Sequence, residues 1–197
     1  ACMPDNLAAL LPIPDWSRAR LTRPDCGLAA CALPGAWLVS GDLVAYGVQT
    51  GRDAKGLGAL GQSDGPTYSL RMARARLLVV DDAPPAANGW HDAGFAVSDV
   101  SAALCAFDIT GPAQMDILAR GAVLDPEQPG PGAALMFGGM PVALCRVGSA
   151  IRLHLEAPLA PAIWHWLTAV GREVSGGRAS GAASGCDRRA PDEDPQG

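Results

Sequence analysis

The chain has 197 residues, of which 49% are hydrophobic and 18% charged, and its formal net charge is -5. This length suits one domain with a buried core. The acidic balance excludes broad attraction to nucleic acid or anionic lipid, because both require a basic surface. The apolar runs are shorter than the roughly 20 residues of a membrane helix. The first 14 residues, ACMPDNLAALLPIP, lack the basic region of a secretory signal, which predicts a cytoplasmic protein.

The first half of the chain gives weak secondary-structure signals. Residues 7–21, LAALLPIPDWSRARL, form an initial segment interrupted by two prolines, and residues 35–49, GAWLVSGDLVAYGVQ, predict one or two short strands broken by glycines. The polar, Gly-rich stretch over 50–66 predicts a long loop. Residues 76–85, RLLVVDDAPP, predict a strand that ends at the two prolines.

The loop contains GLGALG, residues 56–61, which matches the dinucleotide-binding pattern G-x-G-x-x-G. That site requires a buried strand before the first glycine and a helix whose N-terminus meets the pyrophosphate. Here TGRDAK precedes the motif and QSDGPT follows it, and neither predicts the required element. We therefore expect a flexible glycine-rich loop and no NAD site in this chain.

The second half is more regular. Residues 102–109, AALCAFDI, alternate in polarity and predict a strand, and a short helix follows from Pro112 to Gly121, where Gly121 suits a left-handed cap. AALMF (133–137) and MPVALCRV (140–147) predict two strands around a tight Gly138-Gly139 turn. IRLHLE (151–156) predicts a strand whose odd-numbered residues face inward and whose Arg152, His154 and Glu156 face outward.

Residues 158–174 carry the strongest helical pattern in the chain. Six apolar residues fall on one face at helical spacing: Leu159, Ile163, Trp166, Leu167, Val170 and Val174. Residues 175–197, SGGRASGAASGCDRRAPDEDPQG, have little to bury and are expected to be disordered. The order of elements predicts a single α+β domain over 1–174, with helices packed on an antiparallel sheet, followed by a disordered tail over 175–197.

The cysteine and histidine pattern does not predict a metal site. Six cysteines are scattered without a CxxC motif, and three histidines accompany them. Cys105 and Cys145 lie in apolar, strand-like runs, where a thiol behaves as a small hydrophobic group. We expect reduced cysteines and no metal in this chain.

Two stretches resemble the gamma subunit of heterotetrameric sarcosine oxidase. Residues 94–126, GFAVSDVSAALCAFDITGPAQMDILARGAVLDP, contain the family's DVS stretch, TGP helix start, LARG helix end and LDP step. Residues 152–167, RLHLEAPLAPAIWHWL, are similar to its RLHV strand and aromatic WxWL helix. The resemblance implies a fold similar to the folate-binding domain of the glycine-cleavage T-protein.

The resemblance also implies a complex of alpha, beta, gamma and delta chains. Such a complex demethylates sarcosine to glycine, with formaldehyde or methylene-tetrahydrofolate and hydrogen peroxide as the other products. The resemblance places FAD, FMN, NAD and tetrahydrofolate in the partner subunits and no cofactor in this chain. A related complex could act on another N-methyl amino acid, such as N-methylglutamate.

A stand-alone folate-binding protein or aminomethyl transferase is the alternative from a different class. T-proteins carry an acidic pair in a GGILDDLIV-like hairpin, and one of those acids contacts the folate. This chain reads GGMPVALCRV, with Val142 and Ala143 at the corresponding positions. An apolar pair can neither hydrogen-bond a pterin nor move a proton, so we expect a non-catalytic subunit that serves assembly.

The other polar residues do not form a catalytic set in the sequence. Asp99, within SDVS, is predicted to bond local backbone groups, and Ser98 and Ser101 lack a triad context. On the last helix, Trp164 falls beyond the edge of the apolar face and His165 points away from it. We expect Trp164, with His165 at the rim, to contribute to a partner interface, or else Trp164 to pack under a loop of its own chain.

Overall fold

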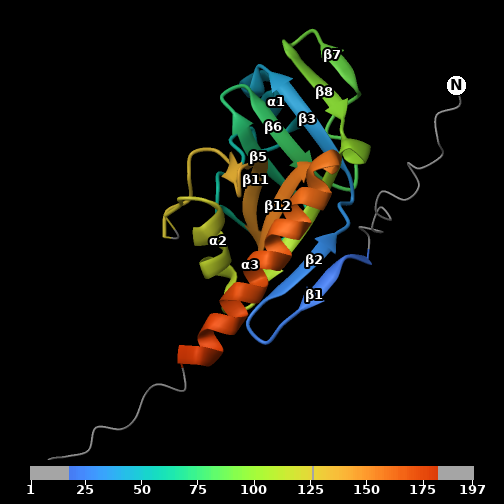
Figure 1. Cartoon of the computed structure of the whole chain (residues 1–197). Helices are drawn as coiled ribbons and strands as arrows, with labels where there is room; N and C mark the ends of the chain where they lie inside the picture. Colours follow the sequence, from blue (N-terminus) through green and yellow to red (C-terminus); the bar gives the residue numbers. More distant parts are fainter. Residues whose placement is uncertain (1–17, 126, 182–197) are drawn as a thin grey trace, which may run out of the picture.

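The structure, a computed structural model, describes residues 18–125 and 127–181 and consists of two antiparallel sheets with helices on their outer faces (Figure 1). The strands of the first sheet are β1 (Arg20–Thr22), β2 (Gly27–Cys31), β4 (Gln62–Ser63), β9 (Leu104–Thr110), β10 (Ala134–Phe137), β11 (Met140–Val147) and β12 (Ala150–Glu156). The second sheet contains β3 (Ala36–Gly41), β5 (Tyr68–Ala73), β6 (Arg76–Val80), β7 (Gly89–His91) and β8 (Phe95–Asp99). The helices are α1 (Leu43–Thr50), α2 (Gln114–Gly121) and α3 (Ala160–Gly181), with helical turns η3 (Ser101–Ala103) and η4 (Ala157–Leu159).

The first sheet has the order β1-β2-β9-β12-β11-β10, with β4 pairing in parallel to the end of β11. Its other pairings are antiparallel, and β10 and β11 are joined by the predicted turn, in which Gly138 and Gly139 both have positive φ angles. The second sheet has the order β5-β6-β3-β8-β7 and is antiparallel throughout. The antiparallel sheets and packed helices confirm the α+β class predicted from the sequence.

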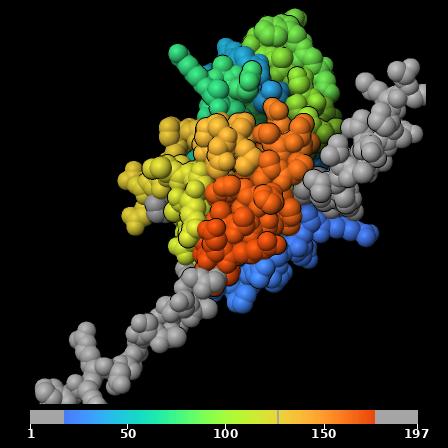
Figure 2. Space-filling view, viewed as in Figure 1, coloured from blue at the N-terminus to red at the C-terminus, as the bar shows by residue number. Residues whose placement is uncertain are grey.

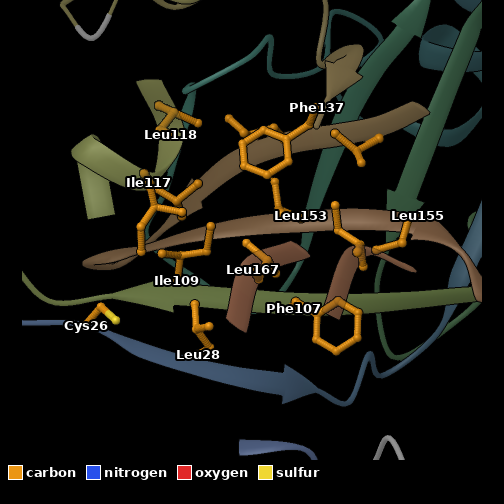
Figure 3. Close-up of a cluster of buried hydrophobic side chains, with 14 of the residues drawn as sticks. Cys26, Leu28, Phe107, Ile109, Ile117, Leu118, Phe137, Leu153, Leu155 and Leu167 are labelled. Carbon is orange, nitrogen blue, oxygen red and sulfur yellow. The ribbon is translucent and has the colours of Figure 1, made fainter. Parts of the chain in front are cut away.

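Helices α2 and α3 cover one face of the first sheet. In Figure 3 the side chains of Ile117, Leu118 and Leu167 lie in one cluster with Ile109 and Leu153 of the strands, and all five are at most 2% exposed. Burying a side chain of this size contributes about 1.5–3 kcal/mol. The predicted stripe of α3 is therefore confirmed as the face that packs on the sheet. On the molecular surface α3 lies beside the β1–β2 hairpin (Figure 2).

The opposite face of the first sheet packs against the second sheet. Ala143 and Cys145 of β11 meet Tyr68, Leu70 and Leu78 in a separate buried cluster. A third cluster lies on the far side of the second sheet, where α1 packs on it through Leu43 and Tyr46. The chain thus forms four layers: α2 and α3, the first sheet, the second sheet and α1.

The structure corrects the prediction of strands over residues 35–49. Residues 36–41 form β3, but residues 43–50 form the helix α1, because the Asp42 carboxylate accepts hydrogen bonds from the N–H groups of Val44 and Ala45. An Asp N-cap stabilises a helix by about 1 kcal/mol. It offsets the glycine at position 47 inside the short helix.

The glycine-rich stretch 56–61 is a loop, as predicted, but it is packed into the molecule. Ala59 and Leu60 are 2% and 4% exposed, and Leu60 has a φ of 61°. Ala59 N–H donates to the Gly132 carbonyl, and a Cβ on Gly58 would collide with the Gly130 carbonyl. Gly58, the second glycine of the pattern, is therefore required because the backbone of the same chain leaves no room for a Cβ there. No helix follows the motif directly to bind a pyrophosphate.

Two predicted helix ends are also corrected. Gly121 belongs to α2 and is not a left-handed cap; its missing Cβ instead gives room to the Phe137 ring. Helix α3 continues to Gly181, so the expected boundary between 174 and 175 falls inside it. Val174 is buried, and Cys26 Sγ lies 3.9 Å from Ser175 Oγ, so packing against the segment that precedes β2 extends past that boundary. The rest of the predicted tail, residues 182–197, lies outside the described residues.

Candidate functional site

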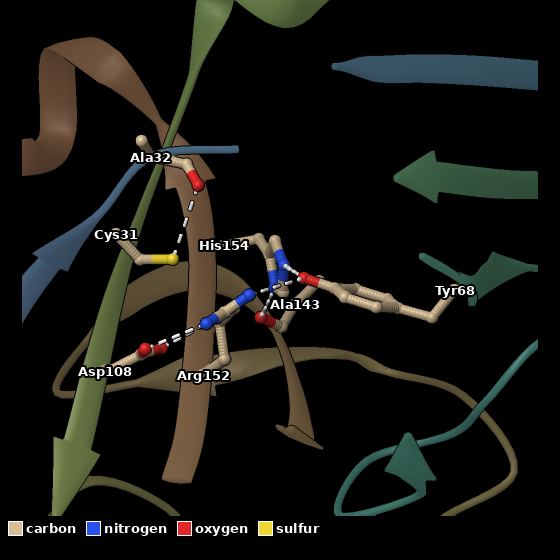
Figure 4. A network of polar contacts seen from close by, with 7 residues as sticks. All are labelled: Cys31, Ala32, Tyr68, Asp108, Ala143, Arg152 and His154. Atoms are coloured by element: carbon tan, nitrogen blue, oxygen red, sulfur yellow. Dashed lines mark hydrogen bonds and ion pairs between the residues drawn. The ribbon is translucent and has the colours of Figure 1, made fainter. Parts of the chain in front are cut away.

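A polar network crosses the space between the two sheets (Figure 4). Arg152 of β12 donates two parallel hydrogen bonds to Asp108 of β9. Nε donates to Oδ1 at 2.7 Å, and Nη2 donates to Oδ2 at 2.8 Å. Its Nη1 donates to the Tyr68 hydroxyl of β5 at 3.4 Å, and this hydroxyl lies 2.7 Å from Nε2 of His154. The network therefore joins strands of both sheets.

The direction of the hydrogen bonds in this network is determined by its last acceptor. Nδ1 of His154 lies 3.3 Å from the Ala143 carbonyl oxygen, which can only accept. The proton of a neutral His154 is therefore on Nδ1, and Nε2 accepts from the Tyr68 hydroxyl. Each donor in the series from Arg152 to Tyr68 to His154 has an acceptor, and the buried polar groups are satisfied.

Burial holds the network in one protonation state. Desolvation lowers the pKa of His154 to about 4 and raises the pKa of Tyr68 above its usual value. The hydrogen bonds to Asp108 raise the pKa of Arg152. At neutral pH the network thus contains one ion pair, a neutral tyrosine and a neutral histidine. None of these groups is poised to exchange a proton near pH 7.

The position of His154 corrects the prediction that this side chain faces outward from the fold. Its side chain does lie on the face opposite Leu153 and Leu155, as the alternation predicts, but His154 is 2% exposed. The second sheet covers that face, and Tyr68 supplies the polar contact. Tyr68 was not predicted as part of a site, because it is 86 residues from His154 in sequence.

The hairpin residues that replace the T-protein acids are buried. Val142 is 4% exposed and packs toward α2 and α3, whereas Ala143 is 1% exposed and faces the second sheet. Their side chains can neither accept nor donate a hydrogen bond. The hairpin therefore has no side chain at position 142 or 143 that could hydrogen-bond a pterin.

The same hairpin lines a large apolar groove of about 880 Å³. We name it the β10 groove. Its apolar walls include Leu38, Met72, Leu78, Val100, Met136 and Pro141. Arg76 of β6 and Glu156 of β12 also line it, one on each sheet. The β10 groove is concave and mostly apolar with few charges, which is typical of sites for ligands or partner side chains.

The two residues predicted for a partner interface are adjacent on α3 but differ in their surroundings. Trp164 is partly buried, with its ring centroid 5.4 Å from that of Phe107, so part of the ring packs within its own chain. His165 is exposed. Both residues thus lie at the edge of the face through which α3 packs on the first sheet. Their role in a partner interface stays a prediction.

The remaining candidate residues have local or structural roles. Asp99 accepts from the N–H of Ser101 at 2.9 Å and from its hydroxyl at 2.7 Å, as the turn interpretation predicts. The four described cysteines are free thiols, and burial raises the pKa of Cys105 to about 11 and of Cys145 to about 12. Cys2 and Cys186 lie outside the described residues.

Neither a metal centre nor a membrane helix is found in the part of the chain that the structure describes. Over residues 18–125 and 127–181, no three His, Cys, Asp or Glu side chains gather as metal ligands. In the same ranges, no helix is both long and apolar enough to cross a bilayer.

The layers and strand orders define an α+β fold of two packed antiparallel sheets. No protein-family model matches the chain, and no curated protein matches it significantly. Among solved structures, it is similar to a chain in the heterotetrameric sarcosine oxidase from Corynebacterium sp. U-96 in complex with pyrrole 2-carboxylate, with a TM-score of 0.60 and 22% identity. The similarity covers 79% of this chain and 89% of that chain. At this identity it establishes a shared fold.

Proposed function

We propose that this chain is the gamma-type subunit of a sarcosine-oxidase-type flavoenzyme complex and that it serves assembly rather than catalysis. The observation that carries the proposal is the fold shared with a chain of a heterotetrameric sarcosine oxidase over 79% of the sequence. The ordered motifs over 94–126 and 152–167 support it independently.

The site chemistry supports a non-catalytic role. The polar network is largely buried, and its histidine is neutral, 2% exposed and hydrogen-bonded at both ring nitrogens. Val142 and Ala143 provide no proton-transfer group at the hairpin. Under this proposal alpha, beta and delta subunits are the partners, and they hold FAD, FMN, NAD and tetrahydrofolate.

Co-expression with tagged alpha and beta chains from the same genome tests the proposal. We expect the chain to co-purify with them in fixed stoichiometry, and to be required for a stable complex. A chain that stays alone while the other subunits assemble into an active oxidase would contradict an assembly role.

The size of the β10 groove favours one competing proposal, a folate-binding protein. The groove includes the hairpin residues Val142 and Ala143 in its walls and has room for a drug-sized ligand. Calorimetry of the isolated chain with tetrahydrofolate separates the proposals. We expect no saturable heat, and clear stoichiometric binding would favour the folate-binding protein.

The substrate of the complex is a further part of the proposal, since its contacts would lie in the flavin-bearing chain. We expect turnover of sarcosine by the reconstituted complex. Parallel assays with N-methylglutamate and dimethylglycine would identify a complex that acts on a related N-methyl amine.

A further inference from the structure

Among the described residues, no strand pairs with the outer edge of β10. In the hairpin, Phe137 pairs with Met140 next to the two-residue turn, and Leu135 pairs with Val142 further along. In such a hairpin these are the hydrogen-bonded pairs. The alternation of an antiparallel ladder then directs the backbone N–H and C=O groups of Ala134 and Met136 away from β11. Within the described residues these groups make no hydrogen bond. β10 thus presents a short row of free donors and acceptors along the β10 groove.

Apart from the short length of β10, this edge lacks the features that usually protect a sheet from pairing with another chain. β10 reads ALMF, without proline, lysine or another charge, and Met136 is 59% exposed. Natural sheets protect an exposed apolar edge with charges, prolines or a covering segment. The outer edge of β10 therefore has the properties of a surface that is covered in the assembled protein.

The charges in the β10 groove restrict what can cover the edge. Arg76 lies on the second sheet and Glu156 on the first, both are exposed, and neither forms an ion pair within the described residues. Apolar side chains such as Leu38, Met72 and Leu78 lie in the same groove. A complementary segment would be apolar at its centre, with an acidic residue near Arg76 and a basic residue near Glu156.

We propose that an extended, apolar segment of a partner subunit binds in the β10 groove and adds to β10 as a further strand. Backbone hydrogen bonds to Ala134 and Met136 would give affinity, and the groove would select alternate apolar side chains of the segment. This inference rests on the proposed function, because it identifies the surface through which the chain joins its complex.

Affinity measurements with the co-expressed partner chains test this surface. Met136→Lys places a charge at the edge, and Met136→Pro removes the outward N–H while leaving the bonds to β11 in place. We expect either change to weaken capture by at least about 10-fold, the scale of an interface hot spot. Arg76→Glu should weaken capture more at low than at high ionic strength.

Val48→Lys is the matched control. Val48 is 83% exposed on α1, which covers the opposite face of the second sheet. We expect this variant to bind partners as the wild type does. If wild type, Met136→Lys and Met136→Pro all bind equally, the β10 groove is not the interface, although the proposed function stands. If the wild type binds no partner chain, the proposed function fails, and this inference fails with it.

Hydrogen exchange gives a readout that does not depend on any variant. The Ala134 and Met136 amides should exchange rapidly in the isolated chain and slowly in the complex. Protection in the isolated chain that is lost on deleting residues 1–17 would identify the chain's own N-terminal segment as the occupant. Concentration-dependent dimerisation that Met136→Lys abolishes would identify a second copy. Either result would overturn the proposal of a partner segment.

Discussion

The Tyr68 hydroxyl donates a 2.7 Å hydrogen bond to Nε2 of His154, and the rings meet edge to face with centroids 5.6 Å apart. Tyr68 lies on β5 of the second sheet and His154 on β12 of the first. This bond is therefore a direct polar link between the two sheets, within a cluster that is otherwise apolar.

Tyr68→Phe should lower the free energy of unfolding by about 1–3 kcal/mol, because it leaves Nε2 of His154 buried without a donor. Urea denaturation at pH 7 measures the loss. Tyr46→Phe is the matched control, since the buried Tyr46 hydroxyl has no hydrogen-bond partner among the described residues. We expect the control to be neutral or slightly stabilising, and equal losses for both variants would contradict the role of the Tyr68 bond.

His154 should make stability depend on pH between about 6.5 and 4. Burial lowers its pKa from 6.5 to about 4 in the folded protein. As the pH falls below 6.5, the unfolded chain binds a proton that the folded chain excludes, so the free energy of unfolding falls. The full effect is on the order of 3 kcal/mol and is reached near pH 4.

Denaturation of wild type and His154→Gln at a series of pH values isolates this effect. The difference in stability between the two proteins should shift in favour of the variant as the pH falls through this window. A difference that stays constant from pH 7 to pH 4 would show that His154 has an ordinary pKa.

Gly121→Ala should destabilise the chain by about 1–3 kcal/mol, because the new methyl group would collide with the Phe137 ring. This clash outweighs the helix propensity that alanine gains, about 1 kcal/mol. Thermal unfolding checks the result against Gly65→Ala, whose Cβ would meet nothing within 4 Å. A stabilised Gly121→Ala protein would show that Phe137 can move aside.

Trp164→Ala should have two separable effects. Loss of the Phe107 contact should cost the isolated chain about 1–3 kcal/mol, less than a fully buried tryptophan would. If Trp164 also contacts a partner, the folded variant should bind partner chains more weakly, and His165→Glu should weaken binding without changing stability. Normal binding by both folded variants would remove α3 from the interface.

The elements that could be predicted from the sequence are those with a strong local pattern. The Gly138-Gly139 turn follows from two glycines between apolar runs, and the packed face of α3 follows from helical spacing that places Ile163 and Leu167 together. The strand 151–156 was predicted with the correct alternation. Local periodicity is sufficient for such elements, because it reports which residues share a face.

What could not be predicted depends on contacts between distant segments. Alternation separates His154 from Leu153 but cannot tell whether the second face meets water or another sheet. Tyr68 contacts His154, and the Gly130 carbonyl excludes a side chain at Gly58. In both cases the two residues are far apart in sequence. Helix α1 was not predicted for a local reason: the glycines at 41 and 47 indicated breaks between short strands, whereas Asp42 caps a helix there.

The strand order has a consequence for the protein during its synthesis. All strands of the second sheet lie between Ala36 and Asp99, whereas the first sheet takes β1 and β2 from before this stretch, the short β4 from within it and β9 to β12 from after it. A ribosome that has released residues up to Asp99 has supplied every strand of the second sheet, but β2 still lacks its neighbour. Until β9 emerges, the nascent chain carries an open strand edge and an uncovered Leu28, a condition that makes a chain prone to aggregate or to need a chaperone.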